Sequence, residues 1–179
     1  AGLKMPKKKA YSLLMKMYKE YGIEEHQIYE KFLENVSGKI DYKILSAGII
    51  AYRHVKLNKL VPYPNVKSTL LKLKKKGLVL GIVSDAPRLQ AWLRLTEMNL
   101  VKFFDVVIGF EDTKKIKPSI VPFKKALKQM ELKPSEVIFV GDNPKRDIVG
   151  AKKVGMQTCL AKYGQIVKGN GADFEIEDI

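Results

Sequence analysis

The chain has 179 residues, of which 46% are hydrophobic and 29% charged, and its formal net charge is +14. This length and apolar content exclude wholesale disorder and suit one ordinary core with a small additional subdomain. No apolar run of about 18 residues occurs, and the basic start of the chain lacks the apolar block of a signal peptide, so we expect a cytoplasmic protein without a membrane partner.

The positive charge has two explanations: attraction of anionic ligands, or a lysine-rich solvated surface. Lysines at 7–9, 72–76 and 124–128 alternate with apolar residues at helical spacing, which is typical of the solvent side of helices. We therefore favour the second explanation. High lysine content with a single cysteine, Cys159, is also typical of a thermophile protein, and the apolar surroundings of Cys159 favour a buried structural thiol.

The first third of the chain predicts helices. Apolar residues recur at helical spacing in three stretches, separated by Gly22 and Gly38. Pro62 and Pro64 end this pattern because the residue before a proline is pushed out of helical geometry. We therefore place a helical subdomain at residues 1–62 and a second domain at 63–179. The expected helices cover residues 6–21, 25–36 and 41–52.

The remaining residues predict helices that alternate with short apolar runs. Near-continuous apolar runs between helices are typical of a parallel sheet that is covered on both faces. The predicted fold class is α/β, a Rossmann-like doubly wound parallel sheet with a small all-helical subdomain. The expected helices are 66–76, 87–98, 121–130 and 147–154, and the expected strands are 78–83, 106–108, 137–140, 158–161 and 174–176.

Polar residues follow the predicted strands, where ligands bind in such sheets. Ser84 and Asp85 follow one strand, Lys117 follows the next at a distance, and Asp142 follows a third, with Asp147 five residues on. Each has a structural explanation: Ser84 or Asp85 as a helix cap, Lys117 as a surface charge, and Asp142 and Asp147 as turn and helix-start residues. Together they supply hydroxyl, cation and carboxylates, which phosphoryl transfer with a divalent metal requires.

Three segments resemble, in order and spacing, conserved motifs of the haloacid dehalogenase superfamily. They are 81–85, Lys117-Pro118 and 140–148, and the helix starting near Gly150 is also similar. The glycine-aspartate form of 140–148 looks like the metal-dependent, archaeal-like phosphatases of this superfamily. In the same resemblance, residues 1–62 look like the helical cap that such enzymes insert after their first strand.

The resemblance implies a role for each matched residue. Ser84 would hydrogen-bond the transferring phosphoryl group and Lys117 would neutralise its charge, with Asp85 and Asn143 completing the phosphate- and substrate-binding group. Asp142 would coordinate Mg²⁺, and Asp147 would hold Lys117 or the metal loop in place. The expected enzyme is a Mg²⁺-dependent phosphatase that acts on a small phosphorylated metabolite through an aspartyl-phosphate intermediate.

The family's nucleophile and general acid are two aspartates at the end of a strand that precedes the cap, and no such pair occurs in these 179 residues. We expect this strand to be the central one of the sheet, between the strands that end at Ser84 and Val140. Our expectation is that the natural protein carries about twenty to thirty further residues before this sequence, enough for a strand and a helix, and a final helix after it. The alternative is a degenerate homologue without activity.

Other functions stay open from the sequence. A non-catalytic homologue could bind polyanions or nucleic acid through the basic surface, although no aromatic-rich basic strand or zinc spacing favours nucleic acid. A 2-haloacid dehalogenase would share the fold. Methionine- and tyrosine-rich helices in the cap leave room for a homodimer.

Overall fold

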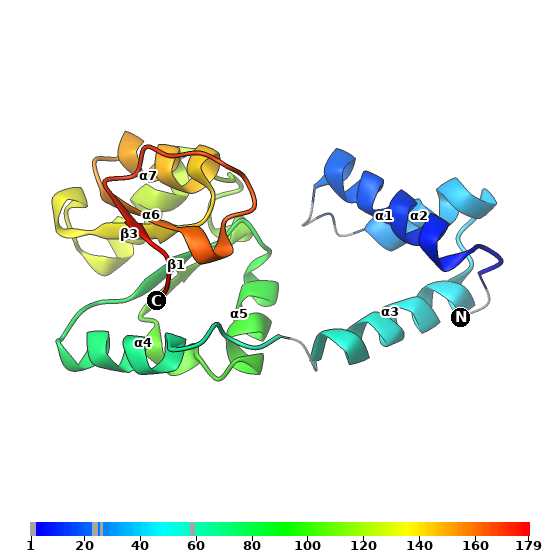
Figure 1. Ribbon diagram of the computed structural model, residues 1–179, viewed down its shortest axis with the longest axis horizontal. Helices are drawn as coiled ribbons and strands as arrows, with labels where there is room; N and C mark the ends of the chain where they lie inside the picture. Colours follow the sequence, from blue (N-terminus) through cyan, green and yellow to red (C-terminus); the bar gives the residue numbers. More distant parts are fainter. Residues whose placement is uncertain (1–2, 23–24, 26, 58–59) are drawn as a thin grey trace. The chain divides into compact units, whose positions relative to one another are not determined.

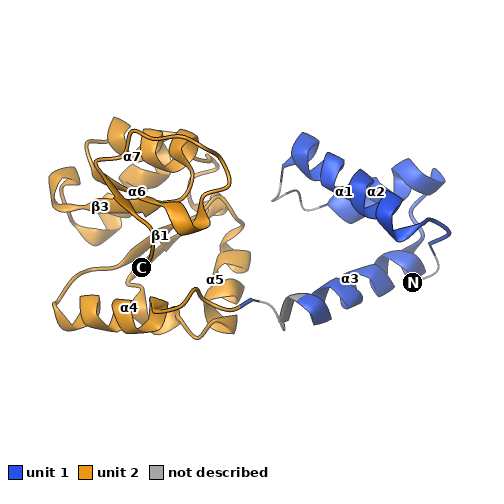
Figure 2. Ribbon diagram, in the orientation of Figure 1, with its two compact units in different colours: residues 1–60 blue, residues 61–179 orange. Residues whose placement is uncertain are grey.

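A computed structural model describes residues 3–22, 25, 27–57 and 60–179. The chain divides into two compact units, residues 1–60 and residues 61–179 (Figure 2). Each unit has its own apolar core, so each is described by itself.

The described residues of the first unit form three helices, as predicted: α1 (Lys7–Tyr21), α2 (Ile28–Ser37) and α3 (Tyr42–Leu57). Gly22 and Gly38 end the first two with φ of 95° and 70°, which glycine adopts at little cost. The Oδ1 atom of Asp41 accepts the backbone N–H groups of Lys43 and Ile44 and so caps the third helix. The helices bury a shared core of Met17, Ile28, Phe32, Leu33 and Leu45.

The second unit alternates helices and strands, which confirms the predicted α/β class. The elements follow one another along the chain in the predicted order (Figure 1), and their bounds differ from the expected ones by a few residues. The larger elements are α4 (Val66–Lys75), β1 (Gly81–Val83), α5 (Arg88–Glu97), β2 (Val106–Ile108), α6 (Ile120–Met130), β3 (Ile138–Gly141), α7 (Val149–Lys153), β4 (Gln157–Ala161) and β5 (Phe174–Ile176).

Both faces of the β1–β2 pair are covered by helices. Alternate residues of a strand point to opposite faces, and here Ile82 and Val107 pack with Leu70 of α4 and Leu95 of α5. On the other face, Val83, Val106 and Ile108 pack with Ala126 and Met130 of α6. This two-sided burial explains why both strands are apolar at every position except Gly81.

The strands of the described residues form two sheets, β1–β2 and β3–β4–β5, and the break falls between β1 and β3, where we expect a further strand. Every strand pair is parallel. No described strand pairs with the free edges of β1 and β3, and Ile138 and Val140 of β3 are each 48% exposed. The two sheets are connected through α6 and α7, which pack against each other and contact strands of both.

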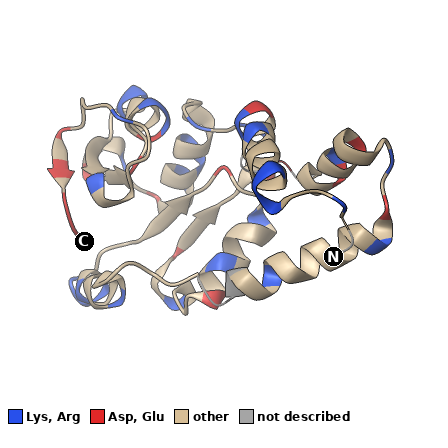
Figure 3. Cartoon of the chain, turned by 45° about the vertical axis from the view of Figure 1, so that its right-hand side comes forward, with Lys and Arg blue, Asp and Glu red and all other residues tan. Residues whose placement is uncertain are grey.

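The positive charge is spread over the helices of both units (Figure 3). The lysines at 7–9 and 124, 125 and 128 are exposed, as the solvated-surface explanation predicts. Within the described part of the chain, no helix is long and apolar enough to span a membrane.

Candidate functional site

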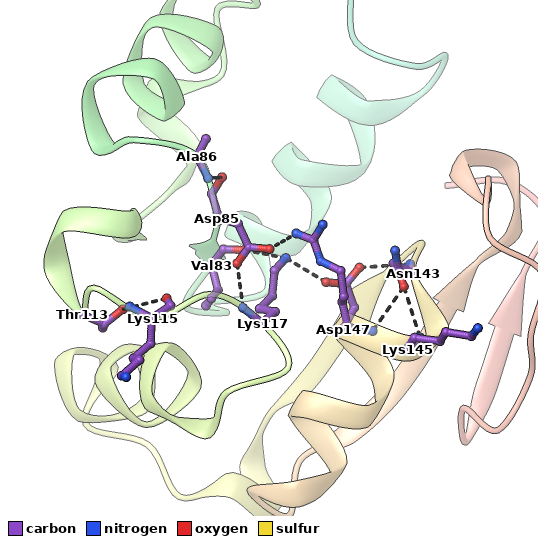
Figure 4. Close-up of polar contacts among 11 residues, drawn as sticks. Val83, Asp85, Ala86, Thr113, Lys115, Lys117, Asn143, Lys145 and Asp147 are labelled. Carbon is purple, nitrogen blue, oxygen red and sulfur yellow. Dashed lines mark hydrogen bonds and ion pairs between the residues drawn. The ribbon is translucent and has the colours of Figure 1, made fainter. Parts of the chain in front are cut away.

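Residues from three loops meet beyond the carboxyl ends of β1 and β3. Ser84 and Asp85 follow β1, Lys117 precedes α6, and Asp142 to Asp147 follow β3. Figure 4 shows the side chain of Lys117 directed toward Asp147, with Asp85 beside it. The structure thus brings together side chains that are far apart in the sequence.

Ser84 extends the β1–β2 ladder, because its backbone N–H donates to the carbonyl oxygen of Ile108 over 2.9 Å. Its Oγ accepts the N–H of Ala86 at 3.1 Å, which fixes the oxygen and leaves the hydroxyl proton able to donate outward. Neither Ser84 nor Asp85 caps α5, whose N-cap residue is Pro87 with no side-chain hydrogen bond. The capping explanation for these two residues is therefore wrong.

Lys117 is the centre of the site. Its Nζ lies 2.7 Å from Oδ1 of Asp147 and 3.1 Å from the carbonyl oxygen of Val83. Its side chain is only 12% exposed and that of Asp147 only 7%, so the pair is desolvated and its charges interact strongly. The backbone N–H of Lys117 donates to Oδ1 of Asp85 at 2.8 Å, which ties its loop to β1. Lys117 is therefore not a solvated surface charge.

The loop after β3 is organised by its own side chains. Oδ1 of Asn143 accepts the N–H groups of Lys145 and Arg146 at 3.1 and 3.2 Å, and Oδ2 of Asp147 accepts the N–H of Asn143 at 3.0 Å. These bonds shape the helical turn Pro144–Ile148. The side chain of Asn143 thus lies beside the other candidate residues, and its Oδ1 atom already accepts these two hydrogen bonds within the loop.

Gly141 lets Asp147 approach the end of β3. A Cβ atom at Gly141 would lie 2.5 Å from Cβ of Asp147 and 2.8 Å from its Oδ2, well inside van der Waals contact. The glycine of the glycine-aspartate motif is thus required for close approach of backbone and side chain.

Asp142 is the candidate metal ligand. Partial burial and the negative charge of Asp147 raise the pKa of the Asp142 carboxyl above its ordinary value. Asp142 and Asp147 thus repel each other, and a cation bound beside Asp142 would relieve this repulsion.

Arg146 was not among the residues predicted from the sequence. Its Nη2 forms an ion pair with Oδ2 of Asp85, which links the loop after β1 to the loop after β3. In the sequence, Arg146 follows Lys145 in a lysine-rich chain, so it looks like one more surface charge. Only the position directly before Asp147 could have suggested a role.

Comparison with known proteins decides the family. Residues 7–161 match the family of haloacid dehalogenase-like hydrolases. This chain belongs to that family. It is also similar to glyceraldehyde 3-phosphate phosphatases of Methanocaldococcus jannaschii, at 37% identity over 99% of this chain and 76% of that protein, and of Pyrococcus furiosus, at 40% identity over 87% of this chain and 65% of that protein.

A solved structure agrees with these relatives. A haloacid dehalogenase-superfamily phosphatase from Thermococcus onnurineus is 28% identical, with a TM-score of 0.72 over 96% of this chain and 74% of that one. The named archaeal relatives are phosphatases, which places this haloacid dehalogenase-like hydrolase with the phosphatases of its family.

Proposed function

We propose that this hydrolase is a Mg²⁺-dependent phosphatase of small phosphorylated metabolites, with glyceraldehyde 3-phosphate as the first substrate to test. The observation that carries the proposal is the desolvated Lys117 ammonium, held between Asp147 and the Val83 carbonyl at the end of β1. A fixed cation in a place with little water is suited to stabilising the charge of a transferring phosphoryl group.

The phosphate end of the substrate would be bound by Ser84 and Lys117. The Ser84 hydroxyl has its oxygen fixed by Ala86, so its proton can be donated to a non-bridging phosphate oxygen. Lys117 carries three N–H donors, and its recorded contacts with Asp147 and Val83 occupy two of them. The third donor is available to the same phosphate.

The residues present fit a hard divalent cation. Asp142 offers carboxylate oxygens, which Mg²⁺ prefers, and Mg²⁺ commonly binds one or two carboxylates with several waters and a substrate phosphate. The described residues contain no cluster of three or more His, Cys, Asp or Glu side chains able to hold a metal, so water and substrate oxygens would have to complete the coordination begun by Asp142. Bound Mg²⁺ would supply positive charge against the phosphate oxygens, while Asp147 keeps Lys117 oriented.

The proposal includes an aspartyl-phosphate intermediate. No aspartate of these 179 residues stands where the family resemblance places the nucleophile, so the covalent step would need an aspartate outside them. The residues described above would bind, orient and neutralise the phosphoryl group during that step.

The test is hydrolysis by the full-length natural protein of an aryl phosphate and of glyceraldehyde 3-phosphate, with Mg²⁺ and with EDTA. We expect phosphate release that needs Mg²⁺ and is lost in Lys117→Ala and Asp142→Ala variants. Lys74→Ala is the matched control, because Lys74 also pairs with an aspartate, Asp105, but on the exposed surface. The proposal fails if no phosphate is released, or if Lys74→Ala loses as much activity as Lys117→Ala.

The same preparation separates the alternative functions. A 2-haloacid dehalogenase would release chloride from a haloacid without added metal. A non-catalytic polyanion-binding homologue would bind nucleic acid with strong salt dependence that Lys117→Ala leaves unchanged.

A further inference from the structure

The ion pair between Asp85 and Arg146 lies in a part of the site that phosphate binding and metal binding leave unused. Asp85 follows β1 and Arg146 follows β3, so the pair joins loops of two separate sheets. Only the neighbouring Lys117–Asp147 pair makes a similar connection among the recorded ion pairs of the described residues.

Desolvation makes this pair more than a surface salt bridge. The Asp85 side chain is 8% exposed, while that of Arg146 is 45% exposed. Among the described residues, no hydrogen bond reaches the buried Oδ2 of Asp85, so the guanidinium of Arg146 is what balances its charge. Removing one partner of such a pair leaves a buried charge uncompensated, unlike the removal of an exposed pair.

Asp85 joins both halves of the site through its two oxygens. Oδ1 accepts the N–H of Lys117 at 2.8 Å, and Oδ2 meets Arg146 in the loop that carries Asp142 and Asp147. A carboxylate engaged in this way is unsuited to binding a phosphate, which carries the same charge. Its geometry instead fixes the distance between the phosphate-binding loops and the metal-binding loop.

We propose that Arg146 is a positioning residue that, through Asp85, holds the metal-binding loop in register with Ser84 and Lys117. The inference rests on the proposed phosphatase function for its kinetic test alone. Because Arg146 acts through Asp85, its loss should lower kcat and leave KM for the substrate nearly unchanged.

The kinetic test compares Arg146→Ala, Arg146→Lys and the control Arg88→Ala in the full-length protein. We expect kcat of Arg146→Ala to fall about 10- to 100-fold, as for other residues that orient metal ligands. Arg146→Lys should recover part of that loss, because it keeps the charge but not the planar guanidinium. Arg88→Ala should keep wild-type kcat.

Arg88 is a matched control because its environment is similar. It pairs with Asp112 at 2.8 Å, and the exposed fractions of the two side chains, 56% and 11%, are close to those of Arg146 and Asp85. A general effect of breaking a half-buried Arg–Asp pair would therefore appear in both variants. Equal losses in Arg88→Ala and Arg146→Ala would overturn the inference, and so would a raised KM with unchanged kcat, which would mean direct substrate binding.

Asp85→Asn provides a second, independent comparison. The amide keeps an oxygen for the Lys117 N–H but loses the charge that faces Arg146. If the two residues act as one unit, the double variant Asp85→Asn/Arg146→Ala should lose no more activity than the more damaged single variant. Additive losses would mean that Arg146 acts without Asp85.

Amide hydrogen exchange tests the same inference without relying on catalytic activity. The N–H groups of Lys117 and Asn143 donate to Asp85 and Asp147, and we expect both to exchange faster in Arg146→Ala but not in Arg88→Ala. An inactive wild type that still shows this pattern would refute the phosphatase and keep the positioning role. An active wild type with unchanged exchange and kcat in Arg146→Ala would refute the positioning role and keep the phosphatase.

Discussion

The two ends of the β3–β4–β5 sheet contain aspartates in opposite electrostatic conditions. At the carboxyl end, Asp142 follows β3, and partial burial and the charge of Asp147 raise the pKa of its carboxyl. At the amino end, Asp173 directly precedes β5. The ammonium of Lys152 and hydrogen bonds from the side chain and backbone of Thr158 lower the pKa of the Asp173 carboxyl to about 2.

The two aspartates differ in how far neighbouring groups compensate the negative charge. Asp173 has its charge matched, because Oδ1 lies 2.9 Å from Nζ of Lys152 and Oδ2 accepts two hydrogen bonds from Thr158. Burial and the charge of Asp147 disfavour the ionised form of Asp142. Groups perturbed in this way are common at ligand-binding and catalytic sites. Neighbouring groups thus favour the ionised form of Asp173, whereas burial and Asp147 disfavour the ionised form of Asp142, an effect that a cation bound there would offset.

The largest effect should come from Lys117→Met. Losing one fixed donor to a transferring charged group commonly lowers kcat by about 100- to 1000-fold, and here the change also leaves Asp147, with 7% of its side chain exposed, without its cation. We expect a loss of kcat in that range and a lowered melting temperature. Steady-state kinetics and thermal unfolding measure the two.

The double variant Lys117→Met/Asp147→Leu distinguishes the two effects. Replacing a whole buried ion pair with apolar side chains is often neutral for stability, so the melting temperature should largely recover while activity stays lost. Recovery of activity along with stability would mean that Lys117 only supports the fold.

Asp142→Asn should lower activity by at least about 100-fold, since even residues that orient metal ligands cost about 10- to 100-fold. The same change should raise the melting temperature at pH 7 in EDTA. A carboxyl whose pKa is raised on folding destabilises the folded state once it is ionised, so the gain should vanish as the pH falls below the ordinary carboxyl range. A melting temperature unchanged at pH 7 would remove the contrast with Asp173.

Most of the fold could be predicted from the sequence, because helical spacing and continuous apolar runs are local signals. The helices near Ala10, Phe32 and Ile49 were found in this way, as were the five strands of the described residues. The break between β1 and β3 lies where a further strand is expected, but the pairing of β2 with β1 and of β4 and β5 beside β3 could not be predicted, because it depends on which strands meet across the chain. The expected strand of residues 78–83 begins only at Gly81, because Asp105 Oδ2 takes the N–H of Leu80.

The candidate site was predicted as a set of residues but not as a network. Order and spacing pointed to Ser84, Lys117, Asp142 and Asp147. Nothing in the sequence shows that Asp85 uses both oxygens inside the protein or that Arg146 is its partner, because these contacts join segments separated by 32 and 61 positions.

Gly141→Ala should lower activity by about tenfold or more, because the new Cβ would displace Asp147 from the end of β3 and so disturb Lys117. Gly150→Ala is the control for crowding: its Cβ would meet a ring carbon of Phe123 at 2.4 Å and lie 3.2 Å from Cα of Pro118, and neither Asp147 nor Asp85 is among its three nearest contacts. We expect Gly150→Ala to lose stability by about 1 to 3 kcal/mol through overpacking and to keep kcat per folded molecule. Active-site titration gives kcat per folded molecule, and thermal unfolding gives the loss of stability. A similar kcat in both variants would contradict the role of Gly141.

Asp173→Asn should have the smallest effect and no effect on kcat. The variant loses the charge that faces Lys152 and weakens the bonds to the fully buried Thr158, so we expect the melting temperature at pH 7 to fall by about 2 to 4 °C. Because the pKa of Asp173 is lowered on folding, its contribution is complete above the ordinary carboxyl value near 4 and disappears as the pH falls through about 2. The melting temperatures of the wild type and the variant should therefore converge between these two pH values. A loss caused by a lysine would instead appear on the alkaline side of neutrality. A difference in melting temperature that stays constant down to pH 2 would mean that the effect comes from the shape of the side chain. The carboxylate charge would then play no part in stabilising the amino end of the sheet.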